Sequence, residues 1–273
     1  MKKLLSVILV LTLAFALAAC GSANTDTTPS DTETEEKDLL AQIQERGYIV
    51  IATEGDWSPW TYHDEAGTLT GLDVAIGKKI AEKLGVEARF EETDWDSILA
   101  GVDSGRFDIA CNGVGYTEKR AEKYNFSDPY VYTHKVLVVR TDNEDIKTVE
   151  DLEGKTTANT ASSTYAALAE EYGATVTPVN TLTETIELLV NGRVDATINA
   201  QVSINDYLEQ HPDANIKVVQ VMAGDPVAYP MRKAADTDTL VAAVNDILQE
   251  LRDSGELAEI SKEFFGLDLT QPD

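Results

Sequence analysis

Two glycine-containing stretches of the chain have features of loops that bind phosphate groups. Residues 113–118 (GVGYTE) begin like a dinucleotide-binding loop, but a glutamate stands where the third glycine of such a loop belongs. Residues 154–156 (GKT) end like a P-loop, but no glycine precedes them at the required spacing. The sequence therefore predicts neither nucleotide binding nor any other cofactor.

Side chains that could act as nucleophiles, bases or metal ligands are few and scattered. The histidines at 63, 134 and 211 are far apart, without the spacing of a metal site, and are better interpreted as surface residues. The chain has no Gly-x-Ser-x-Gly elbow. With 2 cysteines there is no disulfide framework, and Cys111 ends an apolar run, as is usual for a buried, unreactive thiol. The sequence predicts no catalytic residue and no metal ion.

The charge of the chain excludes some classes of partner. The 273 residues include 22 Lys and Arg against 48 Asp and Glu, a formal net charge of -26. Nucleic-acid binding needs clustered Lys and Arg to neutralise phosphate, and adhesion to anionic lipid needs a basic face. Neither is expected, whereas 43% hydrophobic residues are ordinary for a folded globular protein.

The first residues have the pattern of a secretory signal peptide. A basic start precedes an uncharged run, residues 4–17, which is shorter than the roughly 20 residues of a membrane-spanning helix. Residues 17–21 (LAACG) resemble the lipobox of bacterial lipoproteins. The resemblance implies that residues 1–19 are removed and that Cys20 is lipidated. Ordinary secretion, with Cys20 as a chance residue, is the alternative.

An acidic, polar segment follows the predicted cleavage site. Residues 21–38 contain one apolar residue and six carboxylates. Such a segment cannot bury enough apolar surface to fold. Residues 20–38 are therefore predicted to be a flexible tether, and the folded part to run from about 39 to 269.

From residue 48 onward, short runs rich in β-branched residues alternate with helical segments. The predicted strands are Tyr48–Thr53, Glu87–Glu91, Phe107–Cys111, Lys135–Arg140, Thr156–Asn159, Thr175–Val179, Ala196–Asn199 and Ile216–Val221. The predicted helices are Asp73–Leu84, Asp96–Ser104, Ser163–Tyr172, Leu182–Asn191, Val202–Gln210, Asp238–Leu251 and Glu256–Phe265. This alternation predicts an α/β fold in which helices cover mostly parallel sheets.

Five stretches, in order along residues 45–267, form a recognisable set. They are 71–81 (GLDVAIGKKIA), 116–130 (YTEKRAEKYNFSDPY), 151–155 (DLEGK), 192–196 (GRVDA) and 255–266 (GELAEISKEFFG). The set resembles the motifs of family 3 extracellular solute-binding proteins, the binding components of polar amino-acid ABC importers. One departure is Ala75, which stands where the first motif commonly has a second acid.

The resemblance implies a two-lobed periplasmic-binding-protein fold. Each lobe would be a mostly parallel sheet flanked by helices, and two hinge strands would cross between the lobes. Lobe 1 is expected to comprise residues 39–130 plus 229–273, and lobe 2 residues 135–224. The hinges are expected near 130–134 and 225–228. Closure of the lobes would desolvate the ligand and complete its hydrogen bonds.

The resemblance also implies how a ligand carboxylate is bound. The arginine that matches Arg120 grips the ligand α-carboxylate in the family, a task that suits the planar fork of a guanidinium. The alternative is a surface arginine paired with a neighbouring glutamate. Ser163 and Thr164 match positions that add hydroxyl and amide donors, and Ser163 also suits the N-cap of a helix.

Further residues match the walls of the family's cleft. Trp57 and Trp95 match aromatic side chains that sandwich the aliphatic part of the ligand. Asn112, Gly113 and Gly115 would let the backbone approach the ligand. Gly115 departs from the threonine usual there, which removes one hydroxyl group.

The amino-group end of the ligand is the point at which the family pattern fails. The family commonly places an aspartate shortly after the Gly-Arg-x-Asp-Ala motif, and that slot is Ala200 here. A buried ammonium without a counter-charge is costly. Glu54 is the candidate acid, and the amides of Asn199 and Gln201 are candidate hydrogen-bond acceptors.

The resemblance implies a monomeric, lipid-anchored receptor on the extracytoplasmic face of the cell membrane. It would bind a polar amino acid and deliver it to the transmembrane subunits of an ABC permease. Residues 112–115 (NGVG) and 159–163 (NTASS) look like those of cystine-type binders. The alternative is an enzyme on the same scaffold, such as a cyclohexadienyl-dehydratase-like protein. Glu54 is the only candidate acid for catalysis, and no partner accompanies it.

Overall fold

The structure, a computed structural model, describes residues 38–272 of the chain. The predicted signal peptide, Cys20 and nearly all of the predicted tether lie outside the described residues. Asp38, predicted to be the last tether residue, is the N-cap of the first helix. Its side chain accepts a hydrogen bond of 2.8 Å from the amide of Ala41. An aspartate here satisfies one of the unpaired amides of a helix start, so Asp38 belongs to the cap of α1 and not to the predicted tether.

The described residues form helices and strands in the alternating order that the sequence predicts. The helices are α1 (Leu39–Arg46), α2 (Leu72–Leu84), α3 (Trp95–Asp103), α4 (Glu118–Ala121), α5 (Thr164–Glu171), α6 (Leu182–Val190), α7 (Gln201–Gln210), α8 (Asp238–Asp253) and α9 (Glu256–Phe265), with the short 3-10 helices η1 (Val149–Leu152) and η2 (Ala235–Thr237). The strands are β1 (Tyr48–Thr53), β2 (Asp56–Trp57), β3 (Thr61–His63), β4 (Leu69–Thr70), β5 (Glu87–Glu92), β6 (Ile109–Ala110), β7 (Tyr124–Phe126), β8 (Val131–Arg140), β9 (Thr156–Asn159), β10 (Thr175–Pro178), β11 (Ala196–Ala200), β12 (Ile216–Val227) and β13 (Pro230–Arg232).

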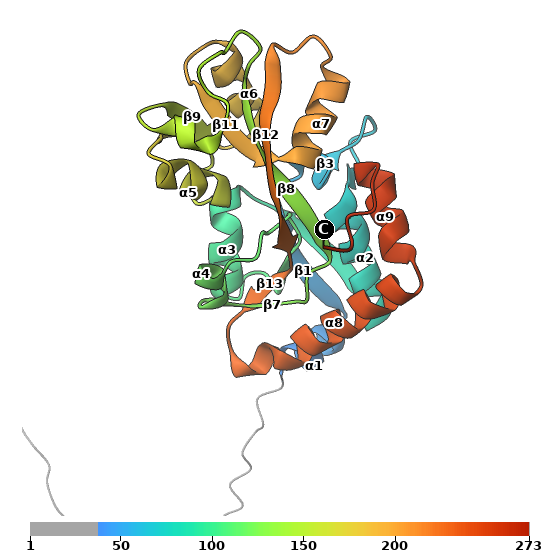
Figure 1. The fold of residues 1–273 in the computed structure, drawn as a ribbon. Helices are drawn as coiled ribbons and strands as arrows, with labels where there is room; N and C mark the ends of the chain where they lie inside the picture. The colour runs from blue at the N-terminus through green and yellow to red at the C-terminus, as the bar shows by residue number, and fades with distance from the viewer. Residues whose placement is uncertain (1–37, 273) are drawn as a thin grey trace, which may run out of the picture. The chain divides into compact units, whose positions relative to one another are not determined.

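The first lobe is built on a fully parallel sheet with the strand order β5-β1-β6. The central strand contributes Ile49 and Ile51 to the core, and α2 packs there through Ile76 and Ile80. Helices α8 and α9, from the end of the chain, join the same core, for example through Leu248. Figure 1 shows α8 beside α1, so the last part of the chain returns to the lobe in which the described residues begin.

The second lobe contains a five-stranded sheet with the order β10-β9-β11-β8-β12. Strand β9 pairs in parallel with β10 and β11, whereas β8 pairs antiparallel with β11 and β12. This sheet is therefore mixed, with more antiparallel pairing than strand–helix alternation predicts. Parallel neighbours need a crossover connection, which α5 provides between β9 and β10.

Strands β8 and β12 run side by side from one lobe to the other (Figure 1). Val131 and Val227, at one end of this pair, are buried in the first core, whereas Leu137 and Val139 are buried in the second. Both strands extend beyond their predicted ends because their pairing continues between the lobes. The chain therefore crosses between the lobes twice.

Several short elements could not be predicted from the hydrophobic periodicity of the sequence. Strands β2, β3, β4, β7 and β13 and helix α4 have too few residues for a period to show. Helix α1 is also missed, because it follows directly on the acidic segment. No helix within residues 38–272 is long and apolar enough to cross a membrane.

Candidate functional site

A cavity lies between the lobes, at the carboxyl ends of parallel strands from both sheets. Glu54 follows β1 and Gly113 follows β6 in the first lobe. In the second lobe, Asn159 ends β9 and Asn180 follows β10. Ligands of α/β proteins commonly bind at this edge, because loops from several strands converge there. The cavity volume is about 70 Å³, enough for several water molecules, since one water needs about 10–15 Å³.

Most of the predicted binding residues line this cavity. They are Glu54, Trp57, Trp95, Gly113, Gly115, Ser163, Thr164 and Asn199. Asn112, Arg120 and Gln201 are not part of its lining, and Gln201 begins α7 directly after Ala200. The structure thus gathers residues from both halves of the chain around one cavity, while their contacts with a ligand stay predictions.

Arg120 borders the cavity rather than lining it. Its guanidinium donates to the carbonyl oxygen of Gly115 at 2.8 Å and, across the gap between the lobes, to that of Ser162 at 3.3 Å. It also lies 5.3 Å from the ring centroid of Trp95. Burial lowers the pKa of Arg120, but a guanidinium stays charged at neutral pH. A guanidinium has five N–H groups, so donors remain for a ligand carboxylate next to the cavity wall.

Asn112 positions Glu54 instead of facing a ligand. Its side chain is fully buried, and its Nδ2 donates to the Glu54 carboxylate at 2.6 Å. Its Oδ1 accepts from the amide of Glu54 at 2.8 Å and from the hydroxyl of Thr61 at 3.1 Å. Asn112 thus holds both the backbone and the carboxylate of Glu54, while the expected approach of its backbone to a ligand stays a prediction.

Among the acids that line the cavity, Glu54 has the most strongly shifted pKa. Burial raises its pKa to about 7, which outweighs the opposing hydrogen bond from Asn112. The nearby carboxylates of Asp56, Asp94 and Asp96 raise it further. Glu54 is therefore only partly ionised at neutral pH, and a ligand ammonium beside it would favour the ionised form.

Glu54→Gln is expected to flatten the dependence of stability on pH. A raised pKa means that the folded state binds more protons than the unfolded state between about pH 4.5 and 7, so this contribution to the unfolding free energy is lost as pH rises. The shift corresponds to a loss on the order of 3 kcal/mol for the wild type. The variant should thus be more stable than the wild type at pH 8. Chemical denaturation at pH 5 and pH 8 measures the difference.

The exposed Glu65 provides the control for this measurement. Glu65→Gln should leave the pH dependence of the wild type intact. If the unfolding free energies of Glu54→Gln and the wild type depend on pH in the same way, burial does not raise the pKa of Glu54.

Gly113 is required by two stacked tryptophans, Trp57 of the cavity wall and Trp60 of the core. Its φ is +58°, and a Cβ at this position would lie 2.6 Å from the ring of Trp57 and 2.9 Å from that of Trp60. The two rings stack with centroids 5.3 Å apart. Close approach to the aromatic pair, more than approach to a ligand, thus explains the glycine.

The start of α5 faces the cavity from the second lobe. Ser163 is the N-cap, and its hydroxyl accepts from the amide of Ala166 at 3.1 Å, as the N-cap prediction requires. Thr164 is the first residue of the helix and also lines the cavity. The positive end of the helix dipole makes this wall favourable for an anion.

Sequence reasoning missed further residues that line the cavity. They are Asp56, Thr133, Lys135, Asn159, Thr160, Tyr165, Asn180, Thr181, Leu182, Thr185, Asp225 and Val227. The carboxyl-end rule for parallel strands could have found those that end or follow β9 and β10. Lys135 begins a predicted strand, and Thr133, Asp225 and Val227 fall in the predicted hinge ranges. Neither prediction indicated that these side chains line a cavity.

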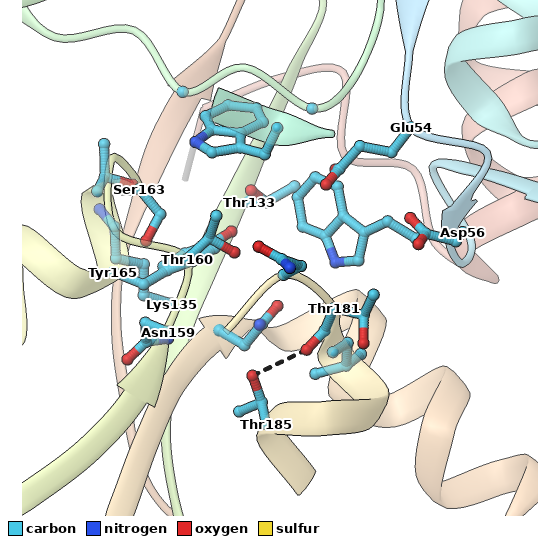
Figure 2. Close-up of a pocket in the computed structure, with 18 of the residues that line it drawn as sticks. Glu54, Asp56, Thr133, Lys135, Asn159, Thr160, Ser163, Tyr165, Thr181 and Thr185 are labelled. Atoms are coloured by element: carbon cyan, nitrogen blue, oxygen red, sulfur yellow. Dashed lines mark hydrogen bonds between the residues drawn. The ribbon is translucent and has the colours of Figure 1, made fainter. Parts of the chain in front are cut away.

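Figure 2 shows how charge is distributed around the cavity. Lys135 lies on the same side as Ser163 and Tyr165, whereas Glu54 and Asp56 lie on the opposite side. The cavity therefore offers a cationic side chain next to a helix start on one side, and two carboxylates on the other.

Groups suited to nucleophilic or metal chemistry are not gathered at the cavity. Cys111 is fully buried, as predicted, and burial raises its thiol pKa. Within residues 38–272, no cluster of His, Cys, Asp and Glu is arranged to hold a metal ion.

Residues 49–267 match the bacterial extracellular solute-binding proteins, family 3. The chain is 38% identical over 238 residues to the L-cystine-binding protein TcyA of Bacillus subtilis, covering 87% of this chain and 88% of that protein. It is 36% identical over 234 residues to a probable amino-acid ABC transporter-binding protein of Haemophilus influenzae, covering 86% and 91%.

Two solved structures show related folds. The L-cystine solute receptor of Neisseria gonorrhoeae, in an unliganded open conformation, is 35% identical, with 85% of this chain and 99% of that chain covered and a TM-score of 0.58. An ancestral arginine-binding protein bound to arginine is 33% identical, with 81% and 99% covered and a TM-score of 0.75.

Proposed function

Because the chain belongs to the bacterial extracellular solute-binding proteins, family 3, we propose that it captures L-cystine and delivers it to the permease of an ABC importer. Its family and its relatives make it an amino-acid-binding protein of an ABC transporter that works outside the cytoplasm, and not an enzyme. The choice of L-cystine and the delivery step are the proposed parts.

The observation that carries this choice is a cavity whose opposite sides favour groups of opposite charge. L-cystine has an ammonium and a carboxylate at each end, joined by an apolar disulfide. The helix start at Ser163 and Thr164 favours a carboxylate on one side, and Glu54 and Asp56 favour an ammonium on the other. Trp57 and Trp95 offer apolar faces to the middle. TcyA and the Neisseria receptor carry cystine in their names, which supports the same choice.

The proposed contacts follow the chemistry of the cavity walls. One α-carboxylate is bound by the guanidinium of Arg120, together with the hydroxyls and amides of Ser163 and Thr164. Glu54 accepts a hydrogen bond from an ammonium. The buried position of Arg120 beside Trp95 and Gly115 supports the first of these contacts.

Ligand capture is proposed to occur by closure of two lobes in a monomer. Lobe 1 comprises residues 39–130 plus 229–273, lobe 2 comprises 135–224, and the hinges lie near 130–134 and 225–228. The two cores that share β8 and β12 support this division. The hydrogen bond between Arg120 and the carbonyl of Ser162 joins the lobes and would open with them.

The function is tested by calorimetry on the wild-type protein with L-cystine and the common L-amino acids. We expect one binding site, the tightest affinity for L-cystine, and no product after prolonged incubation. Tighter binding of arginine or histidine would refute the choice of L-cystine, and turnover of any ligand would refute the receptor function.

A lipid anchor at Cys20 would keep the protein close to its permease, which raises their effective concentration. Cys20→Ser is expected to release soluble protein into the medium or periplasm with its affinity for ligand unchanged. Cell fractionation followed by calorimetry on the released protein measures both properties. A variant that still fractionates with the membrane would contradict lipidation at this residue.

A further inference from the structure

The crossing strands form a charged wall of the cavity. Thr133 and Lys135 of β8, and Asp225 and Val227 of β12, all line it. The ammonium of Lys135 forms an ion pair with the carboxylate of Asp225. Exposure is 19% for the Lys135 side chain and 41% for that of Asp225, so the carboxylate is paired and yet still accessible from the cavity.

Strand register explains why this acid belongs to the binding site. Lys135 lies directly opposite Ala200 on β11, the slot in which an acid was expected but is absent. Side chains of directly opposed residues in an antiparallel pair lie on the same face, with Cβ atoms about 4.5–5.5 Å apart. Ala200 is small and buried, so no carboxylate approaches Lys135 from β11. Asp225 reaches it from β12, the strand on the other side of β8.

From this arrangement we infer that Asp225, held in place by Lys135, pairs the ammonium of the same amino-acid end whose carboxylate Arg120 binds. The inference rests on the proposed function, since it assigns a contact of that ligand. Lys135 is a positioning residue, because its ion pair holds the carboxylate of Asp225 at the cavity wall. The acid that pairs the ammonium is thus on β12, and not on β11 where the family pattern places it.

A consequence concerns the acids on the opposite side of the cavity. Glu54 and Asp56 lie across from Lys135 in Figure 2 and are therefore free for a second ammonium. Two acidic positions on opposite sides select a ligand with two ammonium groups. L-cystine meets this requirement, whereas an amino acid with a neutral side chain does not.

The test compares two ligands by calorimetry at pH 7. L-cystine has two amino-acid ends, whereas S-methylthio-L-cysteine keeps the disulfide and has only one. Asp225→Asn is expected to lower the affinity for both ligands on the order of 100-fold, because both place an ammonium at Asp225. Glu54→Gln is expected to lower the affinity for L-cystine alone. The double variant Lys135→Met with Asp225→Asn, which leaves no unpaired lysine, should show the same loss as Asp225→Asn.

Asp236→Asn is the matched control, because Asp236 is also ion-paired, with Arg232, and lies outside the cavity lining. Its affinities should equal those of the wild type. If Asp225→Asn and the double variant fold, as judged by thermal unfolding, and bind both ligands within threefold of the wild type, the inference is overturned while the proposed function stands. A wild-type protein that binds neither ligand overturns the proposed function and the inference together.

Discussion

Arg120→Ala is expected to weaken the binding of L-cystine by about 2–5 kcal/mol, the usual cost of removing one partner from a buried charge pair. Within its own lobe the guanidinium is held by the carbonyl of Gly115 and lies over the ring of Trp95, so these contacts orient it before a ligand arrives. Alanine would leave the ligand carboxylate without these fixed donors. Calorimetric titration of wild type and variant gives the difference directly.

A second arginine in the same lobe serves as the control. Arg106 also lies over an aromatic ring, 4.7 Å from the centroid of Phe107, but its side chain is 58% exposed and is paired with Glu91. Arg106→Ala should bind like the wild type. Arg120→Lys should recover only part of the loss, because an ammonium cannot donate two parallel hydrogen bonds to a carboxylate. Unchanged affinity in Arg120→Ala would remove the assigned carboxylate site.

Asp73→Ala is expected to lower the unfolding free energy by about 2–5 kcal/mol at pH 5, because it leaves two buried donors unpaired. The fully buried carboxylate of Asp73 accepts from the hydroxyl of Tyr229 at 3.0 Å and from the amide of Gly113. It thus ties the start of α2 both to the loop that shapes the cavity and to the segment after β12. Chemical denaturation measures the loss.

The sign of the pH effect sharpens this prediction. Burial raises the pKa of Asp73 to about 6, so its contribution to stability is lost as pH rises through that value. The difference between wild type and Asp73→Ala should therefore be larger at pH 5 than at pH 8. The exposed Asp103, changed to alanine, should cost no more than about 0.5 kcal/mol at either pH. An equal, small loss in both variants would show that the buried bonds of Asp73 contribute nothing measurable.

The same residue illustrates what a motif can and cannot reveal. Asp73 belongs to the stretch 71–81, and this stretch correctly predicted a helix and a family. Nothing in the motif indicates that its carboxylate accepts from Gly113 and Tyr229. Such partners come together only where the start of α2, the loop after β6 and the segment after β12 meet in the folded chain, which a local pattern does not encode.

For Arg120 too, the motif predicted one part and only the structure showed the rest. Its motif placed it near the ligand site, and the structure brings it to the edge of the cavity, next to Trp95 and Gly115. Its bond to Ser162 in the other lobe depends on how the lobes are arranged. Asn112 was expected to let the backbone approach the ligand, and the structure adds that its side chain donates to the carboxylate of Glu54.

The sequence by itself determined the order of strands and helices, because periodicity and caps act over a few residues. It also determined the family, because the motifs follow one another along the chain. Only the tertiary structure decided that β8 and β12 cross between the lobes together, and that Lys135 faces Ala200 on one side and Asp225 on the other. The physical reason is register: which side chains become neighbours depends on how strands far apart in sequence align, and the hydrogen bonds between those strands exist only in the folded chain.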